Sequence, residues 1–171
     1  MALDFLVKAV GARNEDAREE HKAITITFNW DTEPVKLAKP ITYMNLSGDS
    51  VQALAHYYKI PLDHILVVHD EMDLPFGEIR FKTKGGDGSH NGLTSLLEKL
   101  GTGDFLRLRI GIGRNYPEGS DPAKWLLRNF SKEEQAQLPE IFNNVVDAIE
   151  SVVFDGPVVA MNKFNKKGGP A

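Results

Sequence analysis

The stretch Ile65-Leu66-Val67-Val68, followed by His69-Asp70-Glu71-Met72-Asp73, decides the fold class. A short, uninterrupted apolar run predicts a strand that is buried on both faces, as in the centre of an α/β sheet. The polar residues after it then stand at the carboxyl end of the strand, where open α/β sheets usually bind ligands.

Periodic patterns on both sides of this strand predict further strands and helices. Strict alternation of apolar and polar residues predicts half-buried strands at 24–30, 78–84 and 105–113. Helical spacing of apolar residues predicts helices at 3–10, from Ser47 to Tyr58, at 93–100 and after Ser131. Strands interleaved with helices indicate an α/β sandwich with a mixed sheet.

Local signals set the expected boundaries of these elements. Ser47 is the expected N-cap of its helix, and Ser131 with Glu134 matches a capping box. Pro139 is expected to start a further helix, and the charged residues 12–22 are expected to form a loop. We predict one domain over residues 1–165 and a disordered tail at 166–171.

Composition excludes several classes of protein. The chain has 171 residues, of which 42% are hydrophobic and 26% charged, as in an ordinary globular domain. It has no cysteine, so disulfides, zinc–thiolate sites and a cysteine nucleophile are excluded. No apolar run reaches the ~20 residues of a membrane span, and the net charge of −4 means that nucleic acid would have to bind a local basic patch.

A glycine-rich loop, Gly85 to Asn91, precedes the helix at 93–100. Its backbone N–H groups could hold a phosphate or an oxyanion, but the spacing matches neither common nucleotide-binding motif. The alternative is a plain connection with Asn91 as the N-cap of the helix.

The acidic run after Val68 has two open interpretations. Asp70 could orient an imidazole and raise its basicity, or the acids could cap the turn before Pro75. A metal site is disfavoured because His69 and Asp70, adjacent in an extended segment, point to opposite faces. A serine nucleophile at Ser47 or Ser89 is also disfavoured, since no G-x-S-x-G elbow is present.

Cations alternate along two of the predicted strands. If these strands are close, five basic residues converge beside the glycine loop and could read a phosphate backbone. The alternative is two solvated strand faces. The cations are Arg80, Lys82, Lys84, Arg107 and Arg109.

Four motifs, in this order, resemble the bacterial-type peptidyl-tRNA hydrolase family, and the resemblance covers the chain from the first helix to Phe164. They are KPITYMNLSG (39–48), HDEMDLPFG (69–77), GSHNGL (88–93) and FLRLRIGIG (105–113). The resemblance implies a monomeric, cytoplasmic enzyme with a three-layer α/β/α sandwich around a central mixed β-sheet. It implies no metal or cofactor, and hydrolysis of the ester bond between a peptide and the 3′ end of tRNA.

The resemblance also assigns residues. Tyr43, Asn45 and Asn91 would contact the peptide and the terminal nucleotide, and Met44 and His90 would line the same pocket. Asp70 would orient and stabilise the catalytic base. The tRNA phosphates would be held by Arg80, Lys82, Lys84 and Arg109.

One departure from the family affects the expected activity. The family begins with a strand, a Gly-Asn-Pro-Gly loop and a Thr-Arg-His-Asn segment whose His is the general base; the 171 residues contain none of these, and His21 does not match. We expect a reading frame that starts at an internal Met, with low activity as written. The alternatives are a catalytically inactive tRNA- or RNA-binding homologue, a generic small-molecule α/β hydrolase, and His90 as a weaker base.

Overall fold

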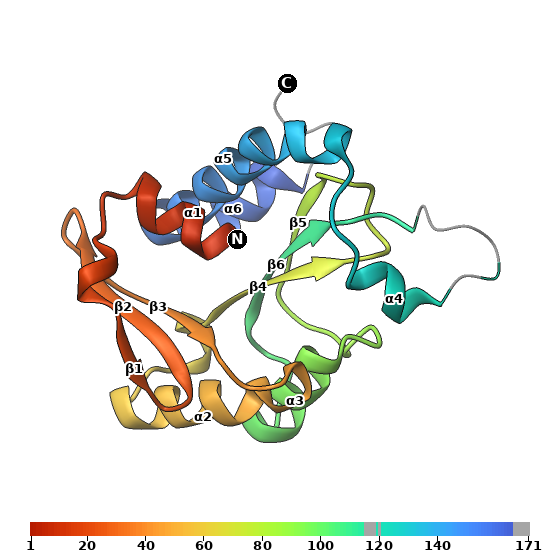
Figure 1. Cartoon of the computed structure of the whole chain (residues 1–171). Coiled ribbons are helices and arrows are strands. Elements are labelled where there is room, and N and C mark those ends of the chain that lie inside the picture. The colour runs from red at the N-terminus through yellow and green to blue at the C-terminus, as the bar shows by residue number, and fades with distance from the viewer. Residues whose placement is uncertain (115–118, 120, 166–171) are drawn as a thin grey trace. The chain divides into compact units, whose positions relative to one another are not determined.

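The computed structural model describes residues 1–114, 119 and 121–165, and the predicted tail at 166–171 lies outside them. The chain divides into two compact units, residues 1–67 with 82–107 and residues 68–81 with 108–171. The described strands form two three-stranded sheets, ordered β1-β2-β3 and β4-β6-β5 (Figure 1). The α/β class is confirmed.

The first unit begins with a helix and an antiparallel sheet. Its elements in this part are α1 (Ala2–Ala9), η1 (Asn14–Asp16), β1 (Arg18–Glu20), β2 (Ala23–Trp30) and β3 (Glu33–Pro40). The prediction that residues 12–22 form a loop is therefore wrong, because this segment contains η1 and β1. Strand β1 pairs with β2 through a two-residue turn in which His21 and Lys22 both have positive φ, 48° and 59°. Such a turn usually carries Asn or Gly, and the absence of both here explains why no hairpin is predicted at this point.

The Glu20 side chain links β1 to β2, β3 and α2 of the first unit by hydrogen bonds. Its carboxylate accepts hydrogen bonds from Thr25 Oγ1 at 2.5 Å, Tyr58 Oη at 2.6 Å and Lys36 Nζ at 2.9 Å. The hydrogen bond from Thr25 is the largest cause, followed by those from Tyr58 and Lys36, and together they lower the pKa of Glu20 to about 2. The ionised carboxylate therefore joins the sheet to the end of the following helix.

Two helices complete the first unit. After η2 (Met44–Leu46) comes α2 (Ser47–Tyr58), then η3 (Leu62–His64) and, later in the chain, α3 (Asn91–Leu100). The backbone of α2 approaches α3 closely at Gly48: a Cβ there would lie 2.1 Å from the Ser95 carbonyl oxygen. The Gly48 N–H donates to Ser95 Oγ at 2.9 Å in the buried contact. Leu93 and Leu96 of α3 form a buried core cluster with Phe105.

The predicted cap of α2 is wrong in one detail. The N-cap is Leu46, and Ser47 is the first helical residue. The Ser47 hydroxyl donates to Met44 Sδ at 3.8 Å, and the residue is buried. The turn η2 already brings the chain into helical geometry before Ser47, so no side-chain cap forms there.

The second sheet comprises β4 (Leu66–Glu71), β5 (Ile79–Lys82) and β6 (Leu106–Gly111), and each of these strands has residues in both units. Strand β4 is the end strand of its sheet, and all six of its residues are half-buried. The prediction of a central strand buried on both faces is therefore wrong for this structure. An apolar run shows that a strand is shielded from water, but it does not show which neighbours provide the shield.

The described part of the second unit contains three helices. They are α4 (Pro122–Leu126), α5 (Lys132–Asp155) and α6 (Pro157–Phe164). The predicted capping box is confirmed, because Ser131 Oγ accepts from the Glu134 N–H at 3.2 Å and Glu134 accepts from the Ser131 N–H at 2.7 Å. Pro139 lies inside α5 and starts no new helix, so that prediction is wrong.

The apolar stripe of α5 packs as its spacing predicts. Ile141, Val145 and Ile149 are buried. A Cβ at Gly77 would lie 2.9 Å from Ile141 Cδ1, so the turn before β5 packs tightly on this helix. At the end of α6, Asn165 accepts from the Phe81 N–H at 2.7 Å and donates to its carbonyl at 3.1 Å. Among the residues with described coordinates, no helix is both long and apolar enough to cross a bilayer.

Candidate functional site

An exposed turn in the first unit carries three of the predicted substrate-binding residues. Tyr43 is 82% exposed and Met44 56% exposed, and Asn45 is exposed beside them in η2. Directly after them the chain becomes buried at Ser47 and Gly48. The close approach of α2 to α3 therefore holds the base of this turn while its side chains remain open to a ligand.

His90 and Asn91 occupy the start of α3 in the same unit. His90 is the N-cap: its Nδ1 accepts from the N–H groups of Gly92 at 3.1 Å and Leu93 at 3.3 Å. In the neutral ring the proton is therefore on Nε2, which acts as a donor. Asn91 is the first helical residue and is exposed, so the expectation that Asn91 caps the helix is wrong.

The two segments meet at Gly92. A Cβ on this glycine would lie 2.8 Å from Met44 Sδ and 3.0 Å from His90 Cε1, so the Met44 side chain lies directly against the start of α3. The exposed turn 43–46 and the start of α3 are therefore neighbours. Each contributes one asparagine amide, a group that offers both a hydrogen-bond donor and an acceptor.

The glycine-rich loop does not leave all of its backbone N–H groups available to an anion. Its Ser89 N–H donates to the Asp87 carboxylate at 3.2 Å and its His90 N–H donates to the Asp87 carbonyl at 3.0 Å. The Thr94 hydroxyl also donates to Asp87 at 2.7 Å, and this bond is the main cause of the lowered pKa of Asp87. Two of the loop's backbone N–H groups are therefore bonded within the loop, beside a carboxylate.

Arg107 is buried against this loop and is not a surface cation. It is 1% exposed, and its guanidinium donates to the carbonyl oxygens of Gly86 and Gly85, each at 2.6 Å. The prediction that Arg107 belongs to the exposed basic patch is therefore wrong, because its side chain is buried. Strand alternation marked Arg107 as facing away from Leu106 and Leu108, but alternation does not show that the opposite face is covered.

The remaining predicted phosphate-binding residues lie in both units. In the first, Lys84 lies 3.6 Å from Asp104, and Lys82 makes no ion pair with any residue in the described ranges. In the second, Arg80 pairs with Glu78, and Arg109 lies 3.6 Å from Glu71. Each of the last two cations is partly neutralised by a carboxylate of its own unit.

Asp70 lies on β4 in the second unit and is half-buried. Its backbone carbonyl is 2.7 Å from His69 Nδ1. The acids that follow have structural partners, since Glu71 pairs with Arg109 and Asp73 lies 2.5 Å from Arg114 Nε. Within the described residues, no three His, Asp or Glu side chains gather as metal ligands would.

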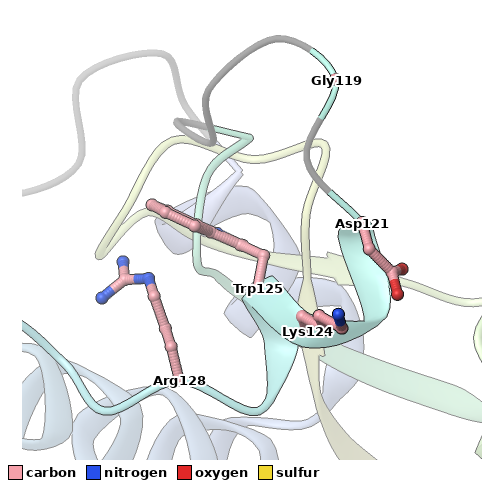
Figure 2. Close-up of a pocket in the computed structure, with 5 residues that line it drawn as sticks. All are labelled: Gly119, Asp121, Lys124, Trp125 and Arg128. Atoms are coloured by element: carbon pink, nitrogen blue, oxygen red, sulfur yellow. The ribbon is translucent and has the colours of Figure 1, made fainter.

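The second unit also contains a cavity of about 490 Å³ that the sequence did not predict. Figure 2 shows its lining residues, Gly119, Asp121, Lys124, Trp125 and Arg128. The Arg128 guanidinium stacks over the Trp125 ring at 3.9 Å and donates to both Glu134 oxygens at 2.5 and 2.7 Å. None of the predicted site residues is among its described lining residues.

Comparison with known proteins gives a consistent result. The family model described as peptidyl-tRNA hydrolase matches residues 1–170. The peptidyl-tRNA hydrolase of Bdellovibrio bacteriovorus is 42% identical over 165 residues, which cover 96% of this chain and 87% of that protein. That of Chloroflexus aggregans is 49% identical over 132 residues, covering 77% of this chain and 70% of the relative.

Solved structures agree with these matches. The crystal structure of peptidyl-tRNA hydrolase from Acinetobacter baumannii has a TM-score of 0.85 at 32% identity, covering 96% of this chain and 82% of that one. A complex of peptidyl-tRNA hydrolase with N-propanol has a TM-score of 0.86 at 32% identity, covering 99% of this chain and 85% of that one. The chain therefore belongs to the peptidyl-tRNA hydrolase family.

Proposed function

We propose that this chain hydrolyses the ester bond of peptidyl-tRNA, releasing free tRNA and the peptide, and that it acts as a monomer in the cytoplasm. The observation that carries the proposal is the junction at Gly92, where the exposed turn with Asn45 meets the helix start with Asn91. Two amides in neighbouring elements suit a substrate with a peptide backbone on one side of the reacting bond.

The chemistry is an acyl transfer to water. A base removes a proton as the water oxygen attacks the ester carbonyl carbon, and the carbonyl oxygen becomes an oxyanion. The oxyanion then collapses, the bond to the ribose oxygen breaks, and that oxygen takes up a proton as tRNA leaves. A side-chain amide N–H at Asn45 or Asn91 can donate to the developing oxyanion, a contact that strengthens as charge appears.

Other residues would serve binding and orientation. The ring of Tyr43 and the thioether of Met44 offer exposed apolar surface for the peptide or the terminal nucleotide. Asp70 orients and stabilises the catalytic base, and Arg80, Lys82, Lys84 and Arg109 hold tRNA phosphates. The family supports these roles through the matching motifs of the chain.

The mechanism also needs a general base. The 171 residues contain no Thr-Arg-His-Asn segment. His90 is poorly suited to replace that histidine, because its Nδ1 already accepts two backbone N–H groups and its Nε2 carries the proton. Without a positioned base, the rate falls by roughly 10²- to 10⁴-fold. The bonding of His90 favours, as a second candidate, an inactive homologue that binds tRNA.

The experiment compares two proteins on purified peptidyl-tRNA. One is the 171-residue chain, and the other is the same chain preceded by a front segment with a strand, a Gly-Asn-Pro-Gly loop and a Thr-Arg-His-Asn segment of the kind with which the family begins. The proposal expects turnover that rises by roughly 10²-fold or more with the front segment. tRNA binding without turnover in both proteins would support the inactive homologue. Cleavage of simple esters that is indifferent to tRNA and to salt would support a generic hydrolase.

A further inference from the structure

Arg107 is buried in the first unit, where its guanidinium contacts an aromatic ring and two carbonyl oxygens. The side chain is 1% exposed and its guanidinium lies over the Phe105 ring, with 4.7 Å between the guanidinium carbon and the ring centroid. The planar group is thus held by stacking on one face, while its edge points to the loop that precedes α3. A buried cation needs such partners, because a charge removed from water without them is very costly.

The partners are two consecutive carbonyl groups. Nη2 donates to the Gly85 oxygen and Nη1 to the Gly86 oxygen, each at 2.6 Å. Gly85 has φ of +145°, a backbone conformation that residues with side chains rarely adopt. The forked guanidinium therefore fixes both carbonyls where the backbone is least restrained by its own residues. A lysine ammonium, a single point charge on a flexible stem, cannot span both oxygens in the same way.

The same loop leads directly to two proposed site residues. From Gly86 the chain passes through Asp87, which is bonded to Ser89 and Thr94, and reaches the cap His90 and then Asn91. Arg107 also contributes, as a minor cause, to the lowered pKa of Asp87. One end of this segment is anchored by α3 and the other by Arg107.

We propose that Arg107 is a positioning residue that holds the loop 85–90 in the conformation presenting His90 and Asn91 to the substrate. The inference rests on the proposed function. Arg107 touches no reacting atom in this account. Arg107 therefore affects substrate binding. A loop that is already ordered does not have to be ordered by the substrate, and only enzyme molecules with the ordered loop bind it.

Arg107→Lys in the front-extended enzyme tests the role. We expect KM for peptidyl-tRNA to rise roughly five- to twentyfold while kcat stays within about twofold, since ground state and transition state lose the same binding. The matched control is Arg128→Lys, another arginine that is stacked on an aromatic ring and bonded through both Nη atoms, but in the second unit. The control should lose stability without a change in KM. An unchanged KM in Arg107→Lys, with normal loop order, would overturn the proposal.

A second measurement keeps the test independent of turnover and of folding defects. Amide hydrogen exchange in the unsubstituted protein should show the N–H groups of Ser89 and His90 protected, and in Arg107→Lys these amides should exchange at least roughly tenfold faster while those of Leu96 and Leu97 do not. Arg107→Met, which also removes the buried charge, serves if the lysine variant does not fold. If the loop amides of the unsubstituted protein exchange as fast as those of a free peptide, the positioning role is rejected. If the loop amides are protected but peptidyl-tRNA is not hydrolysed, only the proposed function is rejected.

Discussion

At the scale of single residues, the account depends on side chains whose bonding partners decide their chemistry. His90 shows this most clearly. His90 is an alternative base in the sequence analysis because the family's base histidine is not in the sequence, but two backbone N–H groups on its Nδ1 make it a helix cap with a donor on Nε2. Asn45 differs, since it is exposed and its amide remains open to a ligand.

Asn45→Ala in the front-extended enzyme tests the amide. If the amide donates to the developing oxyanion, kcat should fall by roughly 10²-fold, the usual loss for one such donor, with a smaller change in KM. Single-turnover hydrolysis of peptidyl-tRNA measures it, and the control is Gln52→Ala, an exposed amide of α2 that donates to the Lys99 carbonyl. Unchanged kcat would remove Asn45 from the reacting centre.

At the scale of elements, the prediction from sequence succeeded where one local pattern was sufficient. Alternation found β2, and the capping box found the start of α5. The prediction failed where a contact with a residue far away in the sequence determines the structure. Strand β1 depends on Glu20 bonding to Tyr58 of α2, and the burial of Arg107 depends on the carbonyls of Gly85 and Gly86. No spacing within a strand or a loop reports such contacts.

The Glu20 carboxylate gives a pH prediction for the first of these contacts. Its pKa is lowered to about 2, so the stability it contributes is fully present above its ordinary pKa of 4.5 and is lost as pH falls from there towards 2. Glu20→Gln should cost roughly 1–2 kcal/mol at neutral pH, and this difference from the unsubstituted protein should shrink on acidification. Urea unfolding at a series of pH values measures it. A difference that is constant with pH would show that the ionised carboxylate does not matter.

The contact between α2 and α3 gives a second prediction at this scale. Gly48→Ala would place a Cβ 2.1 Å from the Ser95 carbonyl oxygen, so the helices must separate. We expect a loss of roughly 1–3 kcal/mol in unfolding free energy. Gly86→Ala is the control, because its Cβ would meet nothing within 4 Å and should change stability by about 0.5 kcal/mol or less. Equal stabilities for the two variants would contradict the close packing.

At the scale of the whole molecule, a net charge of −4 makes general attraction to RNA unfavourable, so binding must be local. Lys82, without an ion-pair partner in the described part of the chain, is the best candidate for a phosphate contact. Lys82→Ala should weaken tRNA binding and reduce the log–log salt slope by about 0.7–0.9 for the phosphate lost. Binding measured over a salt series tests this, with Lys163→Ala as a control on α6. An unchanged slope would remove Lys82 from the interface.

The family, the fold class and the candidate residues could all be named from motifs, because each motif is a local string. The arrangement of the site could not, since it depends on packing between distant segments such as Met44 and Gly92.

The most direct measurement is the rate of peptidyl-tRNA hydrolysis by the front-extended enzyme and by its Asn91→Ala variant. Our account predicts release of free tRNA by the former and a loss of roughly 10²-fold in the latter. Equal rates for the two proteins, or tRNA binding with no hydrolysis by either, would contradict it.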